Sequence, residues 1–262
     1  MMTTDSPVIS ADSHIQEPPE LYEEWLSKKY RHRTPHTTTD SEGRVYRVID
    51  GKRPRRIDIA ESRVTEDDQN REFRSDPSGG RDIGKRLLDQ ERDNICAEVI
   101  YPNQSLFLYN SPDAGYQLAL AKAYNTWLWE LVASNKERFA PVAIVPVADL
   151  DGAVAEAHRV AKLGYRSIKI PITMADRPYN DPAYNPFWAT CEDAGLVVSF
   201  HAFTNSDDRY PEDWGEENGT GGALNLMAMS MIDGMNPVSL LISSGTLMRH
   251  PDLKFVVVEC GA

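Results

Sequence analysis

Six short apolar segments alternate with helical patterns along the chain, and this alternation limits the fold more than any other feature. The segments are VISADSH at 8–14, AEVIYPN at 97–103, APVAIVPV at 140–147, RSIKIPI at 166–172, LVVSFHAF at 196–203 and LKFVVVECG at 253–261. Their apolar residues run almost continuously, as in strands buried on both faces of a parallel sheet. Helical spacing of apolar residues is present in 115–139, 149–164, 185–196 and 236–251. We therefore predict an α/β fold with a parallel sheet.

Two architectures fit this alternation, a (β/α)₈ barrel and an open doubly wound sheet. Neither GxGxxG nor GxxxxGK[ST] occurs, so the two best-known nucleotide-binding forms of the open sheet have no support. In a barrel, functional residues lie at the C-terminal ends of several strands. Polar residues at the predicted strand ends are Asp12 with His14, Asn103, Lys169, His201 and Glu259. This distribution favours the barrel.

The composition indicates a soluble globular protein that acts on small molecules. The chain has 262 residues, 41% of them hydrophobic, with a net charge of −12 and a pI near 5.0. An acidic surface disfavours partners such as nucleic acids and anionic membranes. The three cysteines are far apart and show no CxxC spacing, and the N-terminus lacks a signal-peptide layout, so we expect a cytoplasmic protein. Assembly into a homo-oligomer stays open.

Two polar segments interrupt the alternation. Residues 28–83 are poor in apolar side chains, and YRVIDGKRPRRIDI within them resembles a β-hairpin with Asp50-Gly51 in its turn. Because this insertion follows the first strand, it could cover the barrel mouth as a lid; a solvent-exposed loop is the alternative. Residues 205–222 follow the fifth strand and could line the same pocket.

The strand-end residues suggest a metal site. Asp12 and His14 are two residues apart, so on a regular strand both side chains point to the same face and can bind one ion. His201 supplies a third ligand from a strand distant in sequence, and Glu259 supplies a further carboxylate. Carboxylate and imidazole groups of this kind suit zinc.

The chain resembles the amidohydrolase-related (amidohydrolase family 2) proteins, relatives of aminocarboxymuconate-semialdehyde decarboxylase in the amidohydrolase superfamily. The resemblance rests on ISADSHIQEP, DQERDNICAEVIYPN, YNTWLWELVASNKERFAPVAIVPV, GYRSIKIP, SFHAF and RHPDLKFVVVECGA. It implies a TIM-like barrel and one divalent metal ion, most often zinc, whose ligands here are Asp12, His14 and His201. The family's catalytic histidine on the sixth strand falls at or next to Glu259, so this chain departs from the decarboxylase pattern there.

The resemblance also implies more chain than the 262 residues contain. The sequence stops in or just after the sixth strand, whereas the family continues with two more strand–helix units and an Asp ligand on the last strand. We therefore expect a single barrel domain, C-terminally incomplete, with about six of the eight strands.

Further residues have a structural and a functional interpretation. Glu17 could orient His14 or simply begin the next helix, and Lys169 is expected to face the substrate or form a salt bridge. Asn103 is a third residue expected near the substrate. Cys260 should point away from the metal, because it follows Glu259 directly on the strand.

Three functions remain open from the sequence. With a metal bound, Glu259 could accept a proton from water, which predicts a hydrolase of a small amide, ester or carboxylate substrate. Decarboxylation of an aromatic or enol acid is the alternative within the same family. A non-catalytic barrel, or an inactive fragment of the enzyme, is the alternative of another class.

Overall fold

The computed structural model describes residues 7–18, 20–49, 54–56, 77–174, 176–204 and 219–261. Six parallel strands form one sheet, in the order β1-β5-β6-β7-β8-β9. Their bounds are β1 Val8–Ile15, β5 Ile95–Pro102, β6 Phe139–Ile144, β7 Ser167–Ile170, β8 Val197–His201 and β9 Lys254–Val258. Each strand overlaps one predicted segment, and neighbouring strands follow in chain order, as in part of a TIM barrel. The predicted incomplete barrel is confirmed.

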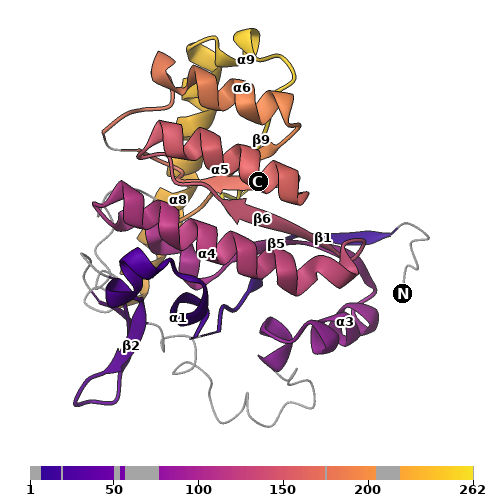
Figure 1. Cartoon of the computed structure of the whole chain (residues 1–262), viewed down its shortest axis with the longest axis vertical. Helices are drawn as coiled ribbons and strands as arrows, with labels where there is room; N and C mark the ends of the chain where they lie inside the picture. Colours follow the sequence, from indigo (N-terminus) through magenta and orange to yellow (C-terminus); the bar gives the residue numbers. More distant parts are fainter. Residues whose placement is uncertain are drawn as a thin grey trace.

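Helices connect the strands and cover one face of the sheet. They are α1 Leu21–Trp25, α3 Ile83–Arg92, α4 Ala114–Val132, α5 Leu150–Leu163, α6 Asn185–Asp193, α8 Gly219–Ser243 and α9 Thr246–Arg249. Figure 1 shows α4, α5 and α6 side by side on the outer face. The main core lies between sheet and helices, with outward residues such as Ile168, Val198 and Phe200 against Trp188. None of the helices in the described ranges is long and apolar enough to cross a membrane.

Two capping residues lie at the ends of α5. The Asp149 carboxylate accepts a hydrogen bond from the Gly152 N–H, as an N-cap does. Gly164 ends the helix with φ of 116°, in the left-handed region that favours glycine. The two residues fix where α5 starts and stops between β6 and β7.

The helix before β9 is longer than the predicted 236–251, and this prediction was wrong at its start. Pro237, near the start of the predicted segment, lies inside the helix, because α8 already begins at Gly219. The buried positions 230, 233, 234, 237 and 241 follow helical spacing. This continuous buried face outweighs the hydrogen bond lost at the proline. The expected loop at 205–222 therefore ends earlier, and residues 205–218 lie outside the described ranges.

A small antiparallel sheet forms within the insertion at 28–83. It contains β2 (His36–Thr39), β3 (Val45–Val48) and β4 (Arg55–Arg56), in the order β2-β3-β4. The antiparallel β3–β4 pairing agrees with the predicted hairpin, whose Asp50-Gly51 turn lies outside the described ranges. Strand β2 was not predicted, since its residues are all exposed and carry no apolar pattern. The lid role of the insertion stays a prediction.

Candidate metal centre

Four potential metal ligands meet at the C-terminal ends of three strands. Asp12 and His14 lie on β1, His201 ends β8, and Glu259 follows β9. One ligand atom from each residue lies within 4.8 Å of all the others. The Asp12 Oδ1 atom is 3.4 Å from the Nε2 atoms of both His14 and His201. The predicted convergence of these side chains is therefore present in the fold.

The backbone of β1 is irregular where it carries the ligands. Ser10 pairs with Glu98 and Ser13 with Ile100, so β1 uses one residue more than β5 over the same length. Such a bulge re-aims the side chains next to it. The buried Arg86 of α3 holds this strand end by donating to the His14 carbonyl (2.9 Å) and to the Glu98 carboxylate (2.6 Å). Asp12 thus lies within the bulge, not on a regular strand as we predicted.

Both imidazoles present Nε2 to the centre. His14 Nδ1 is 2.7 Å from the Pro102 carbonyl, and His201 Nδ1 is 3.0 Å from the Ala202 carbonyl. Because a carbonyl can only accept, each Nδ1 carries a proton, and Nε2 is the nitrogen left to bind a metal ion. The Nε2 of His201 is buried and has no hydrogen-bond partner in the described part of the chain. An orphaned buried nitrogen of this kind indicates an absent ligand.

Asp12 and His14 each shift the pKa of the other toward its charged form. The neighbouring imidazoles of His14 and then His201 hold the pKa of Asp12 far below its ordinary value, against the effect of burial. For His14, burial lowers the pKa, but the neighbouring Asp12 carboxylate, the hydrogen bond to the Pro102 carbonyl and the charge of Glu259 outweigh it, so its pKa is raised. Asp12 is therefore an anion across the physiological pH range.

Glu259 approaches the centre from the side nearest to solvent. Its Oε2 is 3.6 Å from His201 Nδ1, and its side chain is 49% exposed, whereas that of His201 is fully buried. Its backbone has φ of 59°, and Phe203, just after β8, has φ of 62°. Residues other than glycine seldom adopt this conformation, and such strain is concentrated at functional sites.

The geometry of the cluster fits a divalent ion. Zinc bonds of about 2.0–2.2 Å in a tetrahedral site place neighbouring ligand atoms about 3.3–3.5 Å apart. The 3.4 Å separations between Asp12 Oδ1 and the two Nε2 atoms match this spacing and are longer than ordinary hydrogen bonds. Two imidazole nitrogens and two carboxylates also form a suitable set of donors. The residues present can therefore hold one metal ion.

Glu17 and Asn103 lie next to the centre, but Glu17 does not touch His14. Its buried carboxylate accepts hydrogen bonds from the backbone N–H groups of Asn103 (3.2 Å), Gln104 (2.8 Å) and Ser105 (2.8 Å). Its observed role is neither of the two predicted ones: Glu17 anchors the loop after β5, and α1 begins four residues later at Leu21. For Asn103 the observed contact is made by its backbone, and a substrate contact stays a prediction.

Lys169 faces the barrel interior below the centre. It pairs in register with Ser199, two residues before His201 on β8. Its amine is fully buried, and among the described residues it has neither a hydrogen-bond partner nor an ion pair. It lies 4.3 Å from the centroid of the Tyr109 ring. The predicted salt bridge is therefore not observed, and a substrate-facing role stays a prediction.

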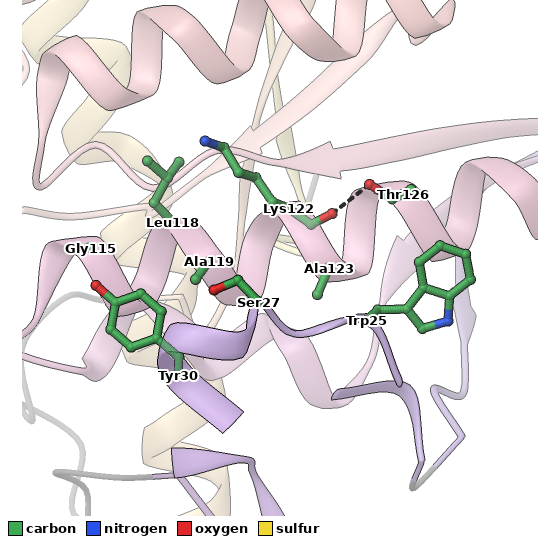
Figure 2. A pocket seen from close by; sticks show the side chains of 9 residues that line it. All are labelled: Trp25, Ser27, Tyr30, Gly115, Leu118, Ala119, Lys122, Ala123 and Thr126. Carbon is green, nitrogen blue, oxygen red and sulfur yellow. Dashed lines mark hydrogen bonds between the residues drawn. The ribbon is translucent and has the colours of Figure 1, made fainter. Parts of the chain in front are cut away.

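Two further features lie apart from the centre. The Cys260 side chain packs with the helix-side core, on the other side of β9 from the centre, as predicted. A surface hollow of about 410 Å³ lies between the α1 segment and the outer face of α4, lined among others by Trp25, Tyr30 and Lys122 (Figure 2). No candidate ligand lines it.

The comparison with protein families gives the identity. A family model described as Amidohydrolase matches residues 90–262. The chain belongs to the amidohydrolase family. It is therefore an enzyme of this family, as the resemblance implied, and the matched region contains His201 and Glu259 but not Asp12 or His14. No curated protein matches the sequence.

Solved structures show the same fold. An amidohydrolase from Mycobacterium avium subsp. paratuberculosis K-10 superposes with a TM-score of 0.75 at 21% identity, covering 99% of this chain and 74% of that one. 2,6-Dihydroxybenzoate decarboxylase from Rhizobium superposes with a TM-score of 0.57 at 18% identity, covering 96% of this chain and 65% of that one. 5-Carboxyvanillate decarboxylase from Novosphingobium aromaticivorans DSM 12444 superposes with a TM-score of 0.62 at 17% identity, covering 97% of this chain and 66% of that one. That enzyme was solved as a mutant with bound manganese and 3-methoxy-4-hydroxy-5-nitrobenzoic acid. The chain spans about two thirds to three quarters of these relatives.

Proposed function

We propose that this amidohydrolase holds one divalent metal ion and hydrolyses a small organic substrate such as an amide or ester. The observation that carries the proposal is the pair of 3.4 Å separations between Asp12 Oδ1 and the two Nε2 atoms, with Glu259 beside them. Asp12, His14 and His201 would hold the ion. When bound, it would polarise a substrate carbonyl and acidify a water molecule.

Glu259 has the properties of the proton acceptor. Its carboxylate lies next to the cluster, and its partial exposure leaves room for water and substrate. It would take the proton of the attacking water and return it to the leaving group. With Nδ1 donated to a carbonyl and Nε2 bound to the ion, neither imidazole could accept a proton, which leaves Glu259 as the proton carrier.

The metal is proposed to be zinc, because zinc favours a small ligand set that combines imidazole and carboxylate groups. Manganese is the alternative, since a structurally similar decarboxylase was solved with manganese bound. Elemental analysis of protein purified without chelators separates the two. The three free cysteines support the expectation of a reducing, cytoplasmic location.

Decarboxylation is the second candidate, because two of the structurally similar enzymes are decarboxylases of aromatic acids. The test is one assay series with zinc or manganese: p-nitrophenyl acetate and small amides for hydrolysis, 2,6-dihydroxybenzoate and 5-carboxyvanillate for CO₂ release. Hydrolysis that Glu259→Gln reduces by about 10²–10⁴ at unchanged metal content supports the proposal. Release of CO₂ without hydrolysis favours the decarboxylase, and no turnover with bound metal contradicts both.

A further inference from the structure

Tyr101 lies directly beneath the two imidazoles. Its ring centroid is 5.1 Å from that of His201, at an interplanar angle of 55°, and 6.2 Å from that of His14, at 44°. The two histidine rings meet edge to face at 5.1 Å and 83°. The three rings therefore form one contact triangle, with spacings in the range of favourable aromatic pairs.

The Tyr101 ring is fixed from below. The residue is 2% exposed and packs with Val142 and Val258 in a small apolar cluster inside the sheet. Its hydroxyl shares a hydrogen bond of 3.1 Å with Ser199, which shares another of 3.1 Å with Ser167. These contacts connect β5, β8 and β7, so the ring has little freedom to tilt away from the histidines.

The contacts to Nδ1 leave one motion of each imidazole unrestrained. A single hydrogen bond from Nδ1 permits rotation of the ring plane about that bond, and such rotation moves Nε2 away from the shared point near Asp12. A rigid aromatic face against both rings limits this rotation. Outer contacts that orient metal-binding histidines typically change metal affinity by about 10–100-fold when removed.

We infer that Tyr101 is a positioning residue for the metal centre: its ring, packed against Val142 and Val258, aligns the Nε2 atoms of His14 and His201 on one ion. The inference rests on the metal site proposed above. The positioning effect comes from the aromatic ring and not from the hydroxyl, because the hydroxyl is hydrogen-bonded to Ser199 and not to either histidine.

The test compares three variants of the chain. Tyr101→Leu removes the ring, Tyr101→Phe keeps it, and Tyr165→Leu is the matched control: Tyr165 is equally buried and its hydroxyl is bonded, but it packs among the helices. Zinc affinity is measured by competition with a chelator, the Co²⁺-substituted protein gives its visible spectrum, and histidine ¹⁵N shifts report Nε2 in the metal-free protein.

We expect Tyr101→Leu to bind zinc about 10–100-fold more weakly, with an altered Co²⁺ spectrum. Tyr101→Phe and Tyr165→Leu should keep the affinity and spectrum of the unmodified chain, although Tyr165→Leu loses thermal stability. Unchanged metal binding in Tyr101→Leu, or an equal loss in Tyr101→Phe, would overturn the inference. If Tyr101→Leu does not fold, the Tyr101→Phe result and the ¹⁵N shifts of the unmodified chain still decide it. A chain that binds no metal at all would instead remove the proposed site.

Discussion

Replacement of Glu17 by Gln should destabilise the protein strongly, although it removes only a charge. The Glu17 carboxylate is 4% exposed and accepts three backbone N–H groups, two at Oε1 and one at Oε2. A glutamine can keep its oxygen toward Asn103 and Ser105, but its NH₂ group then faces the Gln104 N–H. One buried donor loses its acceptor, at about 1–3 kcal/mol, and the other two bonds weaken from charge-assisted to neutral ones. The expected loss in the free energy of unfolding is about 2–4 kcal/mol.

Urea denaturation of the metal-free chain measures this loss. Glu24→Gln on α1 is the matched control, because Glu24 is exposed and should change stability by less than about 0.5 kcal/mol. The ¹⁵N shifts of His14 should not change in Glu17→Gln, since Glu17 binds the loop after β5 and not the imidazole. A loss no larger than in the control, or a changed His14 tautomer, would refute this account of Glu17.

Three further predictions concern single positions. Gly164→Ala should unfold at a clearly lower urea concentration than Gly195→Ala. Both glycines have positive φ, but a Cβ at position 164 would lie 2.6 Å from the Trp129 ring, whereas a Cβ at position 195 would meet nothing within 4 Å. Lys169→Met should raise stability at pH 7 by about 1–3 kcal/mol, because it removes a buried amine that has no hydrogen-bond partner among the described residues; a decrease would indicate that the contact with the Tyr109 ring, or a further partner, stabilises this amine. The pKa of His14 is raised above its ordinary value of 6.5 in the folded chain. The charged His14 therefore contributes fully to the stability of the metal-free chain below pH 6.5, and this stabilisation is lost as the pH rises through the folded-state pKa. His14→Gln should therefore destabilise the metal-free chain more at pH 6 than at pH 8.5 in urea unfolding, and an equal effect at both pH values would contradict the shift.

Much of the fold could be predicted because it depends on local patterns. Continuous apolar runs marked all six strands of the main sheet, and the helical pattern at 149–164 coincides with α5 and its capping residues. The start of α8 could not be predicted in this way, because a proline disfavours the helix interior by local rules, whereas Pro237 lies inside α8 at a buried position. Strand β2 was missed for a different reason: its residues are all exposed and carry no apolar pattern.

The candidate site also contains residues that could be predicted from the sequence and residues that could not. Asp12, His14, His201 and Glu259 were found because their residue types and strand-end positions are visible in the sequence. The partners of Glu17 and the position of Tyr101 were not found, because each depends on contacts between residues about 86–100 positions apart. Nothing in the sequence near Glu17 indicates that it would bind the loop at 103–105, and Tyr101 reads as an ordinary strand residue.

Metal content tests the central claim most directly. The chain is purified without chelators, exposed to zinc or manganese, freed of excess ion and analysed for metals, together with the double variant His14→Gln, His201→Gln. The account predicts one divalent ion per unmodified chain and none retained by the double variant, whose two Nε2 ligands are gone. An unmodified chain that retains no ion, or a double variant that retains as much as the unmodified chain, would contradict it.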